Sequence, residues 1–546
     1  MKNFKPMLFT DLAHYDKKQF FADVVSGIIV AVIALPLSIA LAIASGVTPE
    51  AGIYTAIIAG FLTALFGGSS VQIAGPTAAF ATIVAGIVAR SGTDGLALAT
   101  VLAGLFLLIM GILGLGNLIR FIPYTITTGF TAGIAVTLVI GQLKDFCGVR
   151  YPAGVSPIET IEKAKAFGEN ISTVNFEAVL VGAVCLAILF LWPKVSDKIP
   201  ASLIAVAVGI AAVQIFHLNV LTIGDQFTLS SQLPIFRLPS LSFEKSAAVL
   251  PDAVTIAVLA GIESLLSCVV ADGMVNKHHR SNTELCAQGI ANIGSALFGG
   301  IPATGAIART AANIRNGGRT PVSGMVHSAV LLLILVLLMP YASYIPMPSI
   351  AAILIHVAYN MCGARQFARI IKASPKSDIA VLLVTFVLTV VFDLVVAIGV
   401  GVGMACILFM KRMSDESRIS GWKYDENDEN LRKIPEYVRV YEFSGPIFFA
   451  VVQKLNELTV KDFTRCVILR MRGVPSLDTD ALRGLAAFCD SCREKNIRVI
   501  FSHVNPQPLA AMKKSGLYDK AGEENFAPNI EAALAVAAPT ASIPVK

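Results

Sequence analysis

The stretch that decides the fold is Ile301-Pro302-Ala303-Thr304-Gly305-Ala306-Ile307-Ala308-Arg309-Thr310, which lies deep within a very apolar chain. Gly299, Gly300 and then Pro302 end any helix that precedes it, and the small apolar residues that follow predict a short new helix. A helix that begins within a membrane points its free backbone N–H groups and the positive end of its dipole inward, which favours an anion. Arg309, about one turn into this helix, adds a fixed positive charge.

An earlier stretch has the same order of breaker, small residues and helix: Gln72-Ile73-Ala74-Gly75-Pro76-Thr77-Ala78-Ala79-Phe80. Two interrupted segments in different halves of a membrane protein are the best sequence indication of a transporter's binding site. Gln72 and Thr77 either hydrogen-bond the substrate or cap a helix. Arg309 alternatively pairs with a carboxylate or extends to the membrane surface. We expect these residues to bind substrate: Gln72, Pro76, Thr77, Ala78, Ala79, Phe80, Gly305, Ala306, Ile307, Ala308 and Arg309.

The composition is that of a multi-pass membrane protein. Of the 546 residues, 55% are hydrophobic and 15% are charged, and bilayer-length apolar stretches recur from residue 22 to residue 410. The net charge of +6 is modest and no nucleic-acid-binding motif is present, so we expect no nucleic-acid partner. No nucleophile, metal cluster or phosphate loop indicates an enzyme, and we expect no metal and no cofactor. The nine cysteines lack the paired spacing of extracellular disulfides, and Cys489-x-x-Cys492 is a lone pair with no second metal pair or redox-fold context, so we expect free thiols.

The apolar stretches predict an all-α membrane domain of about fourteen segments, seven in each half, with the interrupted helix third in each half. An odd number of segments per half inverts the second copy relative to the first, which makes an inverted repeat. Pro36, inside the first span, indicates a kink beside a cavity. The expected segments cover residues 22–45, 51–66, 76–90, 96–115, 121–142, 176–191, 201–216, 251–271, 283–298, 306 onward, 322–339, 347–361, 379–392 and a last span to 410.

Basic residues indicate the orientation. Apart from those in the longer connections 144–175 and 219–245, they follow the even-numbered spans, so the positive-inside rule places these loops and both termini in the cytoplasm. Residues 1–18 are polar and carry no cleavable signal, and we expect a multi-pass protein of the inner (plasma) membrane in contact with lipid. The basic residues are Arg120, Lys194, Lys198, Lys277, Arg280, Arg315, Arg319, Arg365, Arg369, Lys372 and Lys376.

The composition changes after Met410, where a polar, charged linker begins. Beyond it, alternating apolar residues predict strands at 438–443, 466–471 and 498–502, with a helix at 480–495, which indicates a small α/β domain. The expected domains are a cytoplasmic N-terminal segment at 1–21, a transport domain at 22–410, a linker at 411–435 and the α/β domain at 436–546.

Over nearly its whole length the chain resembles the SulP family of sulfate-permease-like anion transporters. It departs from the family's signature region at Ala51, where the family commonly has an aromatic residue, and at Ser70, where it commonly has Lys or Arg. The C-terminal part resembles a STAS domain. The resemblance is carried by residues 49–56 with 67–69, by Gln72 and 75–80 (third helix), by Gly261-Ile262-Glu263-Ser264 (eighth helix), by 304–309 (tenth helix) and by 475–480.

This resemblance implies a seven-plus-seven inverted repeat, shared with nucleobase transporters, in which a core domain moves against a gate domain. It implies that the third and tenth helices point their N-termini at the substrate. It also suggests a homodimer, and a STAS domain able to bind a cytoplasmic protein. STAS domains of bacterial regulators carry a phosphorylatable serine at the position of Asp478-Thr479-Asp480, which makes Thr479 a candidate regulatory residue. Simple N-capping by Asp478 or Thr479 is the interpretation that we favour.

Glu263 lies in the middle of the eighth expected span, close to Ser264 and Ser267. A carboxyl group buried in a membrane span suits a residue that picks up and releases a proton. The alternative is a structural ion pair with Arg309, and the two are compatible because protonation of Glu263 would free Arg309 for an incoming anion. The resemblance associates a Glu at this position with proton coupling and an Asp with sodium, so H+ is the expected coupling ion and Na+ the alternative.

We therefore expect a secondary active anion transporter that works by alternating access with H+ symport. The sequence around Glu263 and Arg309 resembles bacterial members associated with C4-dicarboxylates such as fumarate or succinate. Sulfate and bicarbonate stay open, because helix dipoles recognise charge rather than identity. The alternatives are a sodium-coupled bicarbonate or sulfate transporter, a neutral-substrate (nucleobase-like) transporter of the same fold, and a voltage-responsive or signalling scaffold, as prestin is in this family.

Overall fold

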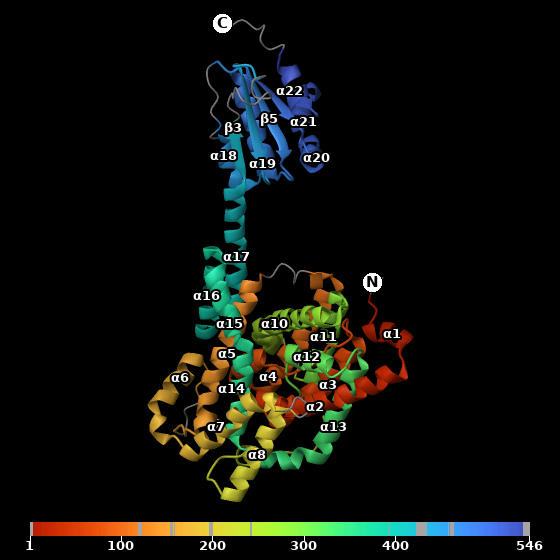
Figure 1. Ribbon diagram of the computed structural model, residues 1–546, viewed down its shortest axis with the longest axis vertical. Coiled ribbons are helices and arrows are strands. Elements are labelled where there is room, and N and C mark those ends of the chain that lie inside the picture. Colours follow the sequence, from red (N-terminus) through yellow and green to blue (C-terminus); the bar gives the residue numbers. More distant parts are fainter. Residues whose placement is uncertain are drawn as a thin grey trace. The chain divides into compact units, whose positions relative to one another are not determined.

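The computed structural model describes residues 4–117, 123–152, 157, 159–195, 200–240, 243–392, 394–421, 434–456, 458 and 463–538. The chain divides into two compact units, Met1–Val402 and Gly403–Lys546. The first unit is helical, and the second contains a five-stranded sheet (Figure 1). Arg120 and Lys198, which contributed to the expected orientation, and the expected start of a span at residue 121 lie outside the described residues.

The helical unit is built from long apolar helices. In the described part of the chain, nine helices are long and apolar enough to cross a membrane. The helices of this unit are α1 (Met7–Asp11), α2 (Lys17–Ala44), α3 (Pro49–Phe66), α4 (Ala78–Ile112), α5 (Tyr124–Cys147), α6 (Thr160–Glu169), α7 (Phe176–Leu191), α8 (Ala201–Phe216), α9 (Ile223–Gln226), α10 (Phe243–Val275), α11 (Ser281–Leu297), α12 (Ile307–Arg315), α13 (Val322–Leu338), α14 (Met347–Cys362), α15 (Ala364–Ala373) and α16 (Lys376–Val391), and α17 (Leu394–Glu416) crosses the boundary between the units.

Helix α4 contains both the third and the fourth expected span. They are separated by a break at Gly92, whose φ of 68° and ψ of −175° lie outside the helical region. A glycine suits this position because a positive φ costs it little. The sequence did not predict two short amphipathic helices, α6 and α15. Helix α6 begins with a capping box in which Glu159 and Glu162 each hydrogen-bond the other's backbone amide.

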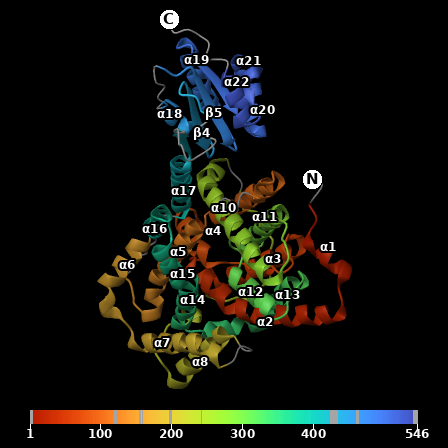
Figure 2. The ribbon, with the colours of Figure 1, turned by 45° about the horizontal axis from the view of Figure 1, so that its top comes forward.

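Two groups of helices make up the unit. Helices α2, α3, α4, α10, α11, α12 and α13 pack on one another, and a second group packs around α5, formed by α7, α14 and α16. Glycines allow the close approaches, as is usual between membrane helices. A Cβ built on Gly104 of α4 would lie 2.6 Å from the carbonyl oxygen of Gly289 on α11, so these two helices meet backbone to backbone. Figures 1 and 2 show α6, α7 and α8 on the side of this unit away from α1.

The second unit is an α/β domain whose sheet has the order β3-β4-β5-β6-β7. Strand β3 is antiparallel to β4, and the other neighbours are parallel. Alternate residues of β5 point to opposite faces, so Val467 and Leu469 pack with α19, whereas Cys466 and Ile468 pack with α22. The elements are β3 (Arg418–Gly421), β4 (Val438–Ser444), α18 (Val452–Asn456), β5 (Cys466–Gly473), α19 (Thr479–Glu494), β6 (Arg498–Ser502), α20 (Pro506–Lys514), α21 (Leu517–Ala521), β7 (Phe526–Ala527) and α22 (Ile530–Ala537).

Candidate functional site

The two interrupted segments lie against each other. Strand β1 (Ala74–Gly75) pairs antiparallel with β2 (Thr304–Gly305), and Ala74 lies opposite Gly305 while Gly75 lies opposite Thr304. The amide of Ala306 extends this contact by donating a 2.8 Å hydrogen bond to the carbonyl oxygen of Ile73. Helices α4 and α12 begin two or three residues beyond the paired strands. The pairing therefore brings their N-terminal ends together.

Side chains of the surrounding helices bind the extended backbone beside the strands. Asn292 of α11 both accepts from the amide of Ala303 and donates to its carbonyl oxygen, each at 2.9 Å. The Thr310 hydroxyl accepts from the amide of Ile73 at 3.0 Å. Unpaired backbone groups are costly within a membrane, so non-helical backbone there must be bound by the protein itself. These contacts satisfy the backbone groups of the two non-helical segments, which allows both helices to be interrupted side by side.

The starts of both helices keep their first amides available. Thr77 and Ala306 occupy the N-cap positions of α4 and α12, and neither forms a side-chain cap. The first amides of a helix have no partner within the helix. Because both helix ends also carry the positive end of a dipole, the two together favour a bound anion.

Arg309 adds a buried cation between these ends. Its side chain is 1% exposed, and its Nη2 group donates to the Ser38 hydroxyl at 3.3 Å and to the Pro76 carbonyl oxygen at 3.2 Å. Among the described residues, Nε and Nη1 have no hydrogen-bond partner, and no carboxylate lies within ion-pair distance. The alternatives of a carboxylate pair and of extension to the surface are therefore not what the structure shows. The guanidinium keeps donors free for a ligand.

The glycine of β1 makes room for this arginine. A Cβ at Gly75 would lie 2.5 Å from Nη1 of Arg309 and 3.6 Å from the backbone of Ala56 on α3. Any larger residue would displace the guanidinium from its place over the strand. The residue before Pro76 therefore has a steric role that the break in the helix alone does not indicate.

Helix α10 contacts both interrupted segments through adjacent residues. The carboxyl group of Glu263 accepts a 3.0 Å hydrogen bond from the Thr77 hydroxyl and also interacts with Thr304. The hydroxyl of the next residue, Ser264, accepts from the amide of Gly305 at 3.0 Å. Thr77 thus hydrogen-bonds Glu263 rather than capping α4. A change in the protonation of Glu263 would act directly at the start of α4.

Gln72 belongs to a buried network behind the strands. Its Nε2 group donates to the carbonyl oxygen of Ser264 and to Oε1 of Glu284, each at 3.1 Å, and its amide packs against Gly305. Glu284 also accepts from the amide of Gly68 and from Gln288, each at 2.9 Å. Nothing in the local sequence marked Glu284, because its partners come from distant segments. Both donor hydrogens of the Gln72 amide are engaged in this network.

The remaining expected residues divide by exposure. Ala78, Ala79, Ala306 and Phe80 are buried, and the Phe80 ring is fully buried. Ile307 is 39% exposed and Ala308 is also exposed, so the first turn of α12 is the more accessible of the two helix ends. The alanines bring small side chains to the helix starts, which leaves the backbone amides uncovered. A residue that the sequence reasoning missed is Ser38, two positions after Pro36, which accepts from Arg309.

In the second unit, Asp478 caps α19. Its Oδ1 accepts from the amide of Ala481 and its Oδ2 from the amide of Phe449, each at 2.8 Å. This is the N-capping that we favoured, and Asp478 provides it. Thr479 is the first residue of α19 and its side chain is exposed. Its modification stays a prediction.

Comparisons with known proteins agree with this architecture. The model of the Sulfate permease family matches residues 20–385, and that of the STAS domain matches residues 430–533. YvdB of Bacillus subtilis, which its name assigns provisionally to sulfate transport, is 39% identical, with 94% of this chain and 97% of that protein aligned. The bicarbonate transporter BicA of Picosynechococcus is 30% identical, with 94% of each chain aligned.

Solved structures give the same result. The transmembrane domain of a cyanobacterial bicarbonate transporter, BicA, superposes with a TM-score of 0.63 at 32% identity, covering 70% of this chain and 98% of that one. Murine Slc26a9, an anion transporter in the inward-facing state, superposes with a TM-score of 0.86 at 16% identity, covering 98% and 94%. The second likeness shows the fold alone. The chain therefore belongs to the sulfate permease (SulP) family, as a multi-pass membrane anion transporter with a C-terminal STAS domain, and is not an enzyme.

Proposed function

We propose that this protein is a secondary active transporter that binds a small anion between the N-terminal ends of α4 and α12. The observation that carries the proposal is Arg309, a buried guanidinium with two nitrogens unpartnered among the described residues, next to two uncapped helix ends. An unbalanced positive site of this kind inside a membrane protein is costly until an anion occupies it. The same balance disfavours a neutral, nucleobase-like substrate, which would gain little from a buried cation.

A C4-dicarboxylate such as fumarate or succinate is the proposed substrate, with sulfate and bicarbonate as alternatives. The support for dicarboxylates is the resemblance of the sequence around Glu263 and Arg309 to bacterial members associated with them. The names of the aligned relatives point instead to sulfate and bicarbonate. A planar guanidinium binds a carboxylate or a sulfate equally well by geometry, so uptake measurements must decide.

The proposed coupling ion is a proton that binds Glu263. This carboxyl group faces Thr77 at the N-cap of α4, and no basic side chain is paired with it among the described residues. A proton on Glu263 would remove a negative charge from beside the anion site, which favours simultaneous binding of anion and proton. Sodium is the alternative coupling ion.

The binding contacts are proposed to come mostly from the backbone. The amides of Ala78 and Ala79 on α4 and of Ile307 and Ala308 on α12 would hold the anion together with Arg309. Gln72 is proposed to act indirectly, because its donors are engaged with Ser264 and Glu284.

Alternating access would follow from movement of a core, the helices around α4 and α10, against a gate, the helices around α5 and α14. We further propose the domain limits stated from the sequence, both termini in the cytoplasm of the inner membrane, and a homodimer. The STAS domain is proposed as the part that binds a cytoplasmic protein, with Thr479 as the candidate regulatory residue.

The test is uptake of labelled fumarate, sulfate and bicarbonate into proteoliposomes, with and without a pH or a sodium gradient. We expect fumarate uptake that an inwardly directed proton gradient stimulates. Stimulation by sodium alone would overturn the role of Glu263. Uptake of sulfate or bicarbonate in place of fumarate would change the substrate and leave the site intact, whereas transport of no anion would overturn the proposal itself.

A further inference from the structure

A cavity leads from the first turn of α4 toward the break at Gly92. Its volume is about 490 Å³, and one of its walls is a single stripe of α4 that begins at Ala79. Ala79, Ile83, Gly86 and Arg90 are spaced by three or four residues, so they lie on the same face of the helix. Eleven residues of helix extend about 16 Å, so the cavity connects the start of α4 with the level of Arg90.

The other walls come from both groups of helices. Asp252 and Thr255 of α10 belong to the same group as α4, whereas Thr137 of α5 and Thr389 of α16 belong to the second group. The cavity therefore lies along the boundary where one group is proposed to move against the other. Five threonines bring hydroxyl groups to its wall: Thr82, Thr137, Thr160, Thr255 and Thr389.

The far end of the cavity carries an ion pair. Nη2 of Arg90 lies 2.9 Å from Oδ1 of Asp252, and the side chain of Arg90 is 61% exposed. A Cβ on Gly86 would lie 3.4 Å from Nη1 of Arg90, so the arginine folds back over the glycine one turn before it, toward the cavity. Glu159, a further acidic residue of the lining, is exposed and caps α6. Because Asp252 neutralises Arg90 and Glu159 adds a negative charge, the Arg90 end of the cavity does not favour an anion until Arg90 releases Asp252.

We propose that this cavity is the route by which anions reach the paired helix ends, and that Arg90 is the cation that first binds them, in exchange for Asp252. The ligand is a small carboxylate or another oxyanion, because a guanidinium that pairs with an aspartate offers the same two donors to either. The inference rests on the proposed function, since it assigns a route and a first contact to the same transported anion. The anion and Asp252 compete for Arg90. Removal of Arg90 should therefore weaken binding of the anion, whereas removal of Asp252 should strengthen it.

Kinetics of uptake into proteoliposomes test the exchange. We expect Arg90→Gln to raise KM for the transported anion about threefold to tenfold, and Asp252→Asn to lower it about twofold to threefold. A pair that only joins α4 to α10 would be broken equally by either change, so shifts of KM in the same direction, or no shift, would overturn the proposal. The matched control is a second exposed pair joining the same two helices, Lys245 with Asp94 at 3.6 Å, which lies outside this cavity. Lys245→Gln and Asp94→Asn should leave KM unchanged.

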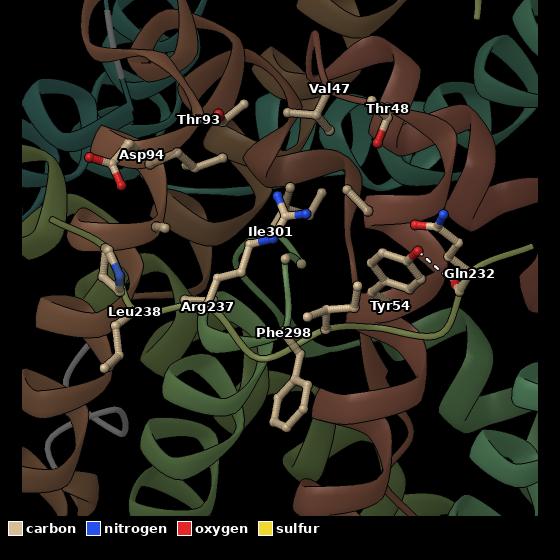
Figure 3. Close-up of a pocket in the computed structure, with 18 of the residues that line it drawn as sticks. Val47, Thr48, Tyr54, Thr93, Asp94, Gln232, Arg237, Leu238, Phe298 and Ile301 are labelled. Atoms are coloured by element: carbon tan, nitrogen blue, oxygen red, sulfur yellow. Dashed lines mark hydrogen bonds between the residues drawn. The ribbon is translucent and has the colours of Figure 1, made fainter. Parts of the chain in front are cut away.

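Thiol labelling tests the route independently of the ion pair. None of the nine cysteines lines this cavity. In Thr82→Cys, an anionic methanethiosulfonate should stop uptake, and the transported anion should slow the labelling. Thr48→Cys is the control, because Thr48 lines another cavity of about 400 Å³, beside Arg237 and Tyr54, that does not include Ala79 (Figure 3).

Labelling of Thr48→Cys should leave uptake intact. Labelled Thr82→Cys that still transports at the original rate would overturn the route. If the unmodified protein transports no anion, the proposed function fails first. If the unmodified protein transports an anion but the Arg90, Asp252 and Thr82 variants do not give the expected results, only the proposed route is wrong.

Discussion

Nη2 of Arg309 donates a 3.2 Å hydrogen bond to the carbonyl oxygen of Pro76, so the cation of one interrupted segment is held by the backbone of the other. Both residues are buried, and the guanidinium has no carboxylate at ion-pair distance in the part of the chain that the structure describes. The positive charge is therefore balanced by carbonyl and hydroxyl dipoles rather than by a counter-charge. A bound anion would complete that balance, which is the reason that we propose the substrate site here.

Replacement of Arg309 is expected to remove transport. Arg309→Gln should lower kcat/KM for uptake by about 100-fold or more, because a buried charge-assisted contact to the anion is lost. Arg309→Lys keeps the charge but loses the planar fork, and an intermediate loss of about tenfold is expected. Arg315→Gln, at the exposed far end of the same helix, is the control and should transport normally. Normal uptake by Arg309→Gln would assign the arginine to packing.

Neutralisation of Glu263 is expected to separate transport from its driving force. Glu263→Gln keeps an oxygen that can accept from Thr77, but it cannot exchange a proton. Uptake by this variant should no longer respond to a proton gradient, while exchange of labelled for unlabelled anion continues. Thr77→Val is the control, because it loses the hydrogen bond but retains the carboxyl group and should keep the stimulation. Stimulation that persists in Glu263→Gln would place the proton elsewhere.

A methyl group at Gly305 is expected to disturb the paired strands. Its Cβ would overlap the side-chain amide of Gln72, so Gly305→Ala should destabilise the protein by about 1–3 kcal/mol, read as a lower midpoint of thermal unfolding in detergent. Gly141→Ala on α5 is the matched control, because its Cβ would enter open space. An unchanged midpoint for Gly305→Ala would mean that the Gln72 side chain can move away from β2 at little cost in stability.

The thiols of α19 are expected to react slowly. Burial raises the pKa of Cys489 to about 12 and that of Cys492 to about 11. Because both values lie above the usual value of about 8.5, the thiols stay protonated at neutral pH, and iodoacetamide should modify them about 100-fold more slowly than in the urea-unfolded chain. Below about pH 8.5 both thiols are protonated in the folded and the unfolded chain. As the pH rises from about 8.5 toward the native pKa values, only the unfolded chain ionises, so the free energy of unfolding falls. Rapid modification of the native protein at neutral pH would contradict this.

The cap of α19 is expected to depend on Asp478 alone. Asp478→Ala removes two hydrogen bonds, to the amides of Ala481 and Phe449, and should destabilise the STAS domain by about 1–3 kcal/mol in denaturant unfolding. Thr479→Ala, one residue later and exposed, should change the free energy of unfolding by no more than about 0.5 kcal/mol. Equal losses in the two variants would argue that the hydroxyl shares the cap.

Local sequence patterns predicted the ends of several helices and the positions of the two helix breaks. The helices α7 and α8 begin and end at the expected residues, because each is a predominantly apolar stretch between polar or breaking residues. Both breaks were visible as Gly and Pro next to small residues, and β1 and β2 do bring them together. Helices α6 and α15 were not predicted, because a short amphipathic helix has too few apolar residues to be distinguished from a loop.

The contacts around the site were less predictable. Gln72 binds Glu284, more than two hundred residues further along the chain, and the partner of Arg309 on α2 is Ser38. No spacing rule connects such distant positions, since only the packing of α2, α10 and α11 brings them together. A Glu263–Arg309 ion pair was the structural alternative that charge alone suggested. In the fold, Arg309 bonds to Pro76 and Glu263 to the next residue, Thr77, so the two charges contact neighbouring residues of one interrupted segment and not each other.

The two-residue ladder between β1 and β2 restricts how the carrier can work. Neither half-helix can tilt or slide alone without breaking backbone hydrogen bonds where no water replaces them. Under the proposed alternating access the two ends would therefore move as one body, and the geometry around the proposed anion site would be the same on both sides of the membrane. A carrier of this design should hold its cargo with the same intrinsic affinity from either side, leaving the direction of net flow to the gradients.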